Sequence, residues 1–309
     1  MSRITLLGPQ DPDSNIHEAL ADLPADLPLV SITAGWRERE GEIEALAHAV
    51  KRPVTDLRLY ARANSVFAAD SAFHTAINER QEQLKEQQRL YRMRLQHLVT
   101  SAYEMLGAET PSADMLHVEQ RAAIAQMRTL DRHHLRRVTQ IHGRFAQAWK
   151  PWERSAMRAQ LDAVEEAVRG AGAILIAGGH VAVLLNRMRL FGVDDLLQGR
   201  RIIAWSGGAM ALSQSVVLYH DRAPEGRRKP EVLGAGLGQV PGIVALPGAA
   251  QRLEREDRHW LALYARRFSP SKCITLNPGA LLQFDEGRLT RADEATRISL
   301  QGRLKQVRA

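Results

Sequence analysis

Hydrophobic and polar positions follow two alternating periods at the start of the chain. The apolar runs ITLLG and LPLVSITAG have the length and composition of buried strands, whereas HEALADL and GEIEALAHAV place apolar residues at helical spacing. The apolar run VTDLRLYA indicates a third strand. A strand and helix alternation of this kind is typical of a parallel sheet covered by helices.

The pattern changes after Ala61, where the chain becomes rich in Gln, Glu, Arg, Leu and Ala. Apolar residues then recur at helical spacing over two long arms, from near Ala69 to Leu106 and onward to Trp149. The string GAETPSAD between the arms supplies a Gly stop, a Pro and a Ser or Asp cap. We therefore predict an antiparallel helical hairpin, whose apolar stripes pack on each other or on a second subunit.

The strand and helix alternation resumes from Gln160. It includes the strands AILIAGG, RRIIAW, KCITLNP and GALLQF and a helix over QRLEREDRHWLALYARRF. The sequence therefore predicts an α/β fold that is discontinuous in the chain, with residues 1–62 and 156–309 forming one domain. Residues 63–155 form the inserted hairpin, which we expect to mediate homo-oligomerisation or the binding of a protein partner.

Composition places the chain among soluble globular proteins, with 309 residues of which 45% are hydrophobic and 25% charged. We find no signal-like start and no run of about eighteen apolar residues, so we expect a cytoplasmic protein without a membrane span. The one cysteine, Cys273, excludes an internal disulfide and lies in a run typical of a buried strand.

The formal net charge of +7 could attract nucleic acid or acidic ligands. The arginines, however, are scattered beside Glu and Asp, and no basic stripe with interleaved aromatic residues occurs, which argues against nucleic-acid binding. His133, His134 and His142 lack further ligands at metal-binding spacing, so we expect exposed helix faces there and neither a metal nor a cofactor.

The string IIAWSGGAMAL is the most informative for chemistry. A hydrophobic strand leads directly into Ser206, Gly207 and Gly208 and then into an amphipathic helix. Small residues after the serine allow a tight turn that exposes the hydroxyl above the sheet and points backbone N–H groups toward a developing oxyanion. Alternatively, Ser206 caps the helix and the glycines serve close packing.

The upstream strand AILIAGGH also ends in a Gly pair, at the sheet edge where α/β folds bind ligands. The backbone N–H near Gly179 is therefore a candidate for the second oxyanion donor, beside that of Gly207.

With AGGHVAVLL followed by AWSGGAMAL, the chain resembles the dipeptidase E and cyanophycinase family of serine peptidases. The resemblance covers roughly residues 3–60 and 160–290. It implies a three-layer sandwich of the class I glutamine amidotransferase-like type, with Ser206 as nucleophile. It also implies that Gly179 and Gly207 surround the oxyanion site, with Gly208 beside them.

Two departures concern the residues that support the serine. Where the family has its catalytic His the chain reads VPGIVALPGAA, and where the family has an acid it reads TLNPGAL. Because a serine without a base is a poor nucleophile, another imidazole is required for activity. His180, which follows the Gly pair, is our first candidate base, followed by His220 and His259.

The orienting acid stays open. Asp194, Asp195 and Asp221 could each orient an imidazole, and Asp285 with Glu286 lies in a string, LQFDEGRL, that is equally typical of a plain turn.

Two hypotheses follow. The chain is either a serine hydrolase that acts on a peptide or isopeptide bond of a small peptide-like substrate, or an inactive relative that works through its hairpin. An amidotransferase is disfavoured, because that activity uses Cys at the position of Ser206 and Cys273 lies on another strand.

Overall fold

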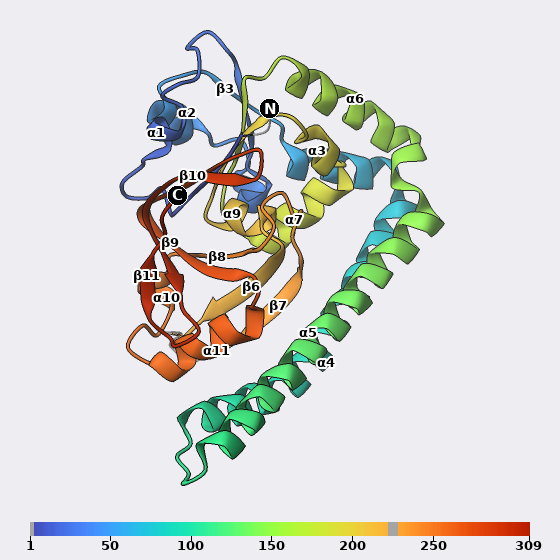
Figure 1. The fold of residues 1–309 in the computed structure, drawn as a ribbon. Coiled ribbons are helices and arrows are strands. Elements are labelled where there is room, and N and C mark those ends of the chain that lie inside the picture. Colours follow the sequence, from blue (N-terminus) through green and yellow to red (C-terminus); the bar gives the residue numbers. More distant parts are fainter. Residues whose placement is uncertain (1–2, 222–227) are drawn as a thin grey trace.

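The computed structural model describes residues 3–221 and 228–309 (Figure 1). Within these residues, nine strands form one sheet in the order β11-β10-β9-β1-β5-β4-β2-β3, with β8 also paired to β9. These strands are β1 Arg3–Leu7, β2 Leu29–Ile32, β3 Val54–Asp56, β4 Ala173–Ile176, β5 Arg201–Trp205, β8 Ile243–Pro247, β9 Lys272–Asp285, β10 Arg288–Ile298 and β11 Leu304–Gln306.

Strands β1, β5, β4, β2 and β3 pair in parallel in this order. On the other side of β1 the pairing is antiparallel, from β1 to β9, from β9 to β10 and from β10 to β11, while β8 pairs in parallel with β9. Two strands lie outside this sheet and form an antiparallel ribbon, β6 Ser215–His220 and β7 Arg228–Ala235. The predicted α/β class with a mostly parallel sheet is confirmed.

Helices cover both faces of the sheet because its central strands are apolar on both sides. In β4, Ile174 and Ile176 face one core and Ala173 and Leu175 the other. The helices around these cores are α1 Ile16–Ala19, α2 Glu44–Val50, α3 Leu59–Ala69, α6 Ser155–Arg169, α7 Val181–Leu190, α8 Val193–Leu196 and α9 Gly207–Leu212, with the short helical segments η1 Ala34–Arg39 and η2 Pro151–Glu153.

The predicted hairpin is present as α4 Ser71–Gly107 and α5 Ala113–Trp149, which run side by side along the α/β domain (Figure 1). The division of the chain at residues 62 and 156 stays a prediction, since α3 continues across the first boundary. Within the described residues, no helix has both the length and the apolar character needed to cross a membrane.

Three expected elements differ from the structure. The run VTDLRLYA forms a short strand, β3, and then opens helix α3 at Leu59. The single helix expected over residues 251–268 is two, α10 Ala249–Arg252 and α11 Arg258–Phe268, because the Asp257 carboxylate caps α11 by accepting from the Trp260 N–H at 2.9 Å. The two strands expected over residues 272–285 are one long strand, β9.

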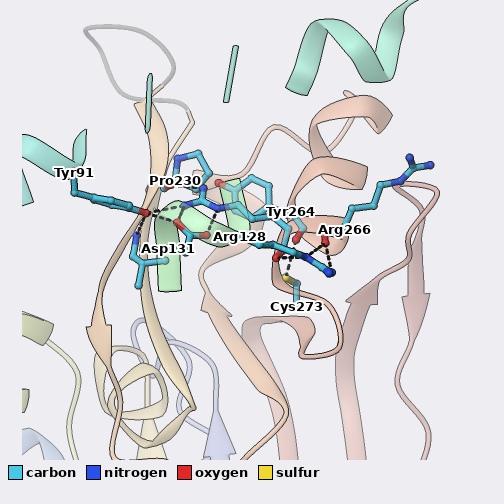
Figure 2. Close-up of polar contacts among 9 residues, drawn as sticks. Tyr91, Arg128, Asp131, Pro230, Tyr264, Arg266 and Cys273 are labelled. Carbon is cyan, nitrogen blue, oxygen red and sulfur yellow. Dashed lines mark hydrogen bonds and ion pairs between the residues drawn. The ribbon is translucent and has the colours of Figure 1, made fainter. Parts of the chain in front are cut away.

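A buried polar network joins the hairpin to α11 (Figure 2). The Arg267 guanidinium donates to both carboxylate oxygens of Asp131 at 2.7 Å and to the Tyr91 hydroxyl at 2.8 Å. The same guanidinium donates to the Pro230 carbonyl at 2.7 Å. Arg267 is only 2% exposed, so its buried charge is stabilised by these partners from α4, α5 and β7 instead of by water.

Candidate functional site

Ser206 connects the end of β5 to the start of α9 and has a strained backbone. Its dihedral angles are φ 51° and ψ −119°, a region that non-glycine residues rarely adopt. Its N–H donates to the Leu7 carbonyl of β1 at 3.3 Å, which ties the turn to the neighbouring strand. Strain of this kind costs about 1–3 kcal/mol and concentrates at functional sites.

Glycines let the end of β4 approach this turn. A Cβ added at Gly178 would lie 2.7 Å from the Ser206 Cβ, and one added at Gly208 would lie 2.3 Å from the Ile176 carbonyl oxygen. Gly179 has φ +96° and would place a Cβ 2.5 Å from the Gly35 carbonyl oxygen. The ends of β2, β4 and β5 therefore meet at backbone distance.

The three predicted oxyanion residues differ in their position relative to Ser206. Gly207 is the first residue of α9, so its N–H has no acceptor within the helix. Gly179 and Gly207 line a cavity together with Ser206. Gly208 is buried against β4 and contributes its small size to the packing of α9. The roles of all three in binding stay predictions.

Two cavities border Ser206 at the carboxyl edge of the parallel strands. One, of about 360 Å³, is also lined by Met210, Tyr219, Gly248 and Arg252. The second, of about 640 Å³, shares Pro9, Gly179 and Ser206 with the first, and its wall also includes Gln10, Ser14, Trp36, Leu46 and His48. Ser206 thus stands where α/β folds place ligands.

The smaller cavity has a basic character. Among the described residues that line it, Arg252 is the only charged one, and it is exposed. Its carbonyl accepts from the Asp221 N–H at 2.7 Å, which fixes the backbone of this segment. An exposed guanidinium there would attract a carboxylate on a bound molecule.

His180 lies close to this edge in sequence but serves as a helix cap. Its Nδ1 accepts from the Val183 N–H at 3.3 Å at the start of α7, and its side chain is exposed. Within residues 3–221 and 228–309, no hydrogen bond joins an imidazole to the Ser206 hydroxyl. Only Nε2 of His180 is therefore left for proton transfer, and its assignment as base stays a prediction.

The other two candidate histidines lie elsewhere. His220 ends β6 and pairs with Arg228 across the ribbon. His259 lies on α11 beside the end of α4, where a Cβ added at Gly107 would lie 3.6 Å from its Nδ1. Neither lines a cavity that borders Ser206.

The candidate acids each have structural partners. The carboxylate of Asp194 accepts from Gln239 at 2.6 Å, and that of Asp195 accepts from Gln198 at 3.4 Å. Asp221 is buried and accepts from the Trp260 indole at 2.6 Å and the Tyr264 hydroxyl at 3.2 Å.

Asp285 accepts from Arg3 at 2.6 Å. Burial alone would raise the pKa of Asp285, but hydrogen bonds from Thr290, Arg3 and Gln283 together outweigh it and lower the pKa. Glu286 follows it in the turn between β9 and β10 and has φ 49°. Asp285 thus ends strand β9, and Glu286 lies in the turn that the sequence offered as the alternative.

The segment VPGIVALPGAA, where the resemblance implies a catalytic His, includes strand β8 and the start of α10. Here β8 ends at Pro247 and continues through Gly248, with φ +67°, into α10. Asn277 lies in the string where the resemblance implies an acid. Its amide oxygen accepts from the Ala250 N–H at 2.7 Å and so holds the start of α10 in place. This segment is therefore a short, hydrogen-bonded connection without a His or an acid. Its Gly248 lines the smaller cavity together with Ser206.

Sequence reasoning missed His48 and Arg252 as residues of the cavities. His48 belongs to the run GEIEALAHAV, which reads as an ordinary helix, and it reaches the site because α2 covers this edge of the sheet. Arg37, with φ 60° and ψ −119°, is a second strained residue at this edge, after the strand that ends in SITAG. That strand end was the one signal that could have directed attention to it.

Comparison with known proteins gives a limited result. The chain matches no protein-family model and no curated protein. Among solved structures it is similar to a peptidase from an acI-B1 actinobacterium, with 12% identity, a TM-score of 0.45 and coverage of 100% of this chain and 95% of that chain. It is also similar to a protein provisionally assigned as peptidase E from Listeria monocytogenes EGD-e, with 11% identity, a TM-score of 0.44 and coverage of 97% and 100%.

Proposed function

We propose that the chain is a serine peptidase-like hydrolase of the dipeptidase E and cyanophycinase type, built on a fold of the class I glutamine amidotransferase-like type. The observation that carries the proposal is the strained backbone of Ser206, which presents a potential nucleophile between two cavities. A turn of this geometry directly after a strand is the arrangement that exposes a nucleophile in α/β hydrolases.

In this mechanism the Ser206 Oγ attacks the carbonyl carbon of a peptide or isopeptide bond. The N–H groups of Gly207 and Gly179 hold the oxyanion that forms. An imidazole takes the hydroxyl proton and returns it to the leaving amine, and water then releases the acyl group from Ser206. His180, through Nε2, is the first base to test, and His48 is the second because it lines a cavity with Ser206.

Charge supports a small acidic, peptide-like substrate. Arg252 contributes the one charge among the described residues around the smaller cavity, and the chain as a whole carries a formal charge of +7. A substrate carboxylate would pair with this guanidinium while the scissile bond lies over Ser206. The mechanism calls for no cofactor.

Labelling with a fluorophosphonate probe tests the proposal. We expect the wild-type protein to be labelled at Ser206, with labelling lost in Ser206→Ala and slowed by at least about 100-fold when the base is removed. His180→Ala and His48→Ala distinguish the two bases. Ser65→Ala is the matched control, because Ser65 is an exposed serine on α3 that lines neither cavity and should leave the labelling rate unchanged. A well-folded wild-type protein that resists the probe would overturn the proposal.

An inactive relative that acts as a binding or oligomerisation module is the alternative. It is favoured by the lack of an imidazole hydrogen-bonded to Ser206 among the described residues and by exposed apolar side chains on α4. Leu90 is 45% exposed and Met93 is 52% exposed, and both line a groove with His133 of α5. Light scattering on wild type and on Leu90→Glu tests it: an oligomer that the substitution dissociates, in a protein the probe does not label, would favour this module.

A further inference from the structure

A second cavity, remote from Ser206, lies where the hairpin meets the α/β domain. It has a volume of about 280 Å³, and its wall comes from α4, α5, α7 and β7. Among its residues are Lys85, Arg92, His142 and Arg189. Within the described part of the chain, no Asp or Glu lines it. The wall of this cavity is therefore cationic.

Of the cations in the wall, Arg189 has no carboxylate partner among the described residues, and nor do Arg80 and Arg187, which lie near it but do not line the cavity. Lys85 pairs with Glu82 and Arg92 with Glu231, but no ion pair within residues 3–221 and 228–309 joins Arg80, Arg187 or Arg189 to an acid. The Nε atoms of Arg80 and Arg187 are buried without a hydrogen-bond partner. Arg189 donates to the Ala235 carbonyl, and the Arg80 guanidinium lies 4.2 Å from the centroid of the Phe145 ring.

The cations act on one another across the hairpin and α7. Burial and the charges of Arg187 and Arg189 lower the pKa of Arg80 to about 10. Burial, together with Arg189 and Arg80, lowers the pKa of His142 to about 4. Burial lowers the pKa of Arg187 and of Arg189, and the nearby charges of Glu40 and Asp194 offset this only in part. An anion in the cavity would relieve the remaining cost of these half-buried charges.

We propose that this cavity binds a small organic anion that carries two or more negative charges, on phosphate or on several carboxylate groups. Guanidinium groups suit both, since their planar fork matches the oxygens of phosphate and carboxylate. The cavity is near the lower end of small-molecule sites, which span roughly 300–1,000 Å³. Leu84, Val138, Leu185 and Leu233 line its other parts and would contact an apolar body of the ligand.

Calorimetric titration with pyrophosphate and with citrate tests the proposal, with sodium chloride at matched ionic strength as reference. We expect saturable binding of at least one anion, weakened by about tenfold or more in Arg189→Gln and in Arg92→Gln, because both arginines line the cavity and each substitution removes a charge-assisted contact. Binding of pyrophosphate alone assigns a phosphate-bearing ligand, and binding of citrate alone assigns a polycarboxylate.

Arg144→Gln is the matched control, because Arg144 is an exposed arginine on α5 close in sequence to His142. It should bind like wild type. If Arg189→Gln or Arg92→Gln does not fold, Lys85→Gln provides the same comparison at an exposed, charged position of the wall. Absence of saturable binding to the wild-type protein, or equal weakening by Arg144→Gln, would overturn the proposal.

Discussion

The strain at Ser206 belongs to the residue and its immediate neighbours. A serine at φ 51° is held there by its N–H bond to the Leu7 carbonyl and by the close approach of Gly178. Glycine would occupy the same backbone without a Cβ penalty. A serine at this position therefore lowers the stability of the fold relative to glycine. Its presence there is better explained by a function of the hydroxyl than by the structure of the turn.

Replacing Ser206 by glycine should therefore stabilise the protein. Removing strain of about 1–3 kcal/mol outweighs the extra freedom that glycine gives the unfolded chain, about 0.4–1 kcal/mol. We expect Ser206→Gly to raise the free energy of unfolding by about 1 kcal/mol and to abolish probe labelling. Urea denaturation followed by circular dichroism measures the first effect.

The control for this experiment is Ser65→Gly, at an exposed position inside α3. Glycine in a helix interior should cost about 0.5 kcal/mol there. If Ser206→Gly destabilised the protein as Ser65→Gly does, the dihedral angles of Ser206 would not represent strain.

The sequence predicted some residues of the candidate site and not others. Ser206, Gly179 and Gly207 were identifiable because strand, turn and helix are adjacent in sequence. His48 was not, since its position depends on how α2 folds over the sheet edge. The helix-capping bond of His180 depends on the actual angle between β4 and α7, which a sequence pattern does not specify.

Among the elements, helix α4 has its N-terminus capped by one side chain, that of Asp70. The Asp70 carboxylate accepts from the Phe73 N–H at 3.0 Å and forms an ion pair with Arg154 at 2.6 Å. The bond from Phe73, with help from Arg154, lowers the pKa of Asp70. The start of the hairpin is thereby tied to the residue just before α6.

Asp70→Ala should lower the free energy of unfolding by about 1–2 kcal/mol near neutral pH. Because the pKa of Asp70 is lower in the folded state, its contribution is fully present above the unfolded pKa, near 4, and is lost as the pH falls through the folded value. The gap between wild type and Asp70→Ala should therefore narrow below about pH 4. Urea titrations across this range measure it.

Asp70→Asn separates the cap from the charge. Asparagine is a comparable N-cap, so this variant should keep much of the stability at neutral pH and show a weaker pH dependence. A gap between wild type and Asp70→Ala that stayed constant into acid would contradict the role of the carboxylate.

The long helices were predictable as elements, and the antiparallel part of the sheet was not. Helical spacing sustained over each arm and the stop signals in GAETPSAD identified α4 and α5. Strand β10, in contrast, is mostly polar and only partly buried, so it lacks an alternating pattern. In β9, the exposed residues 278–279 interrupt the apolar run although the strand continues. Pairing with β10 and β1 keeps the strand intact, and pairing between distant segments is not encoded locally.

For the whole molecule, the decisive feature is that the hairpin is docked on the domain. Asp131 lies 40 residues from Tyr91 and 136 from Arg267, so no local pattern predicts that these side chains meet. Apolar residues of both arms share a core with α11 and β6, including Tyr91, Met127 and Trp260. The stripes expected to pack on each other or on a second subunit therefore also pack on the chain's own α/β domain.

Asp131→Ala should weaken this docking. It leaves the Arg267 guanidinium buried without its carboxylate, which costs about 3–5 kcal/mol. We expect lower stability in urea and a selective loss of hydrogen-exchange protection in α4 and α5, while the central strands stay protected. Glu119→Ala, an exposed acid on the same helix, should change stability by less than about 0.5 kcal/mol.

The double variant Asp131→Leu with Arg267→Met decides whether charge or contact is responsible. Replacing a buried ion pair by apolar side chains of similar volume is often neutral or stabilising, so this variant should recover most of the stability that Asp131→Ala loses. Recovery with restored protection of α4 and α5 would mean that the penalty comes from the unpaired Arg267 charge and that apolar packing holds the hairpin. If the double variant stayed as unstable as Asp131→Ala, the hydrogen bonds from Arg267 to Tyr91 and Pro230 would themselves be what orders this interface.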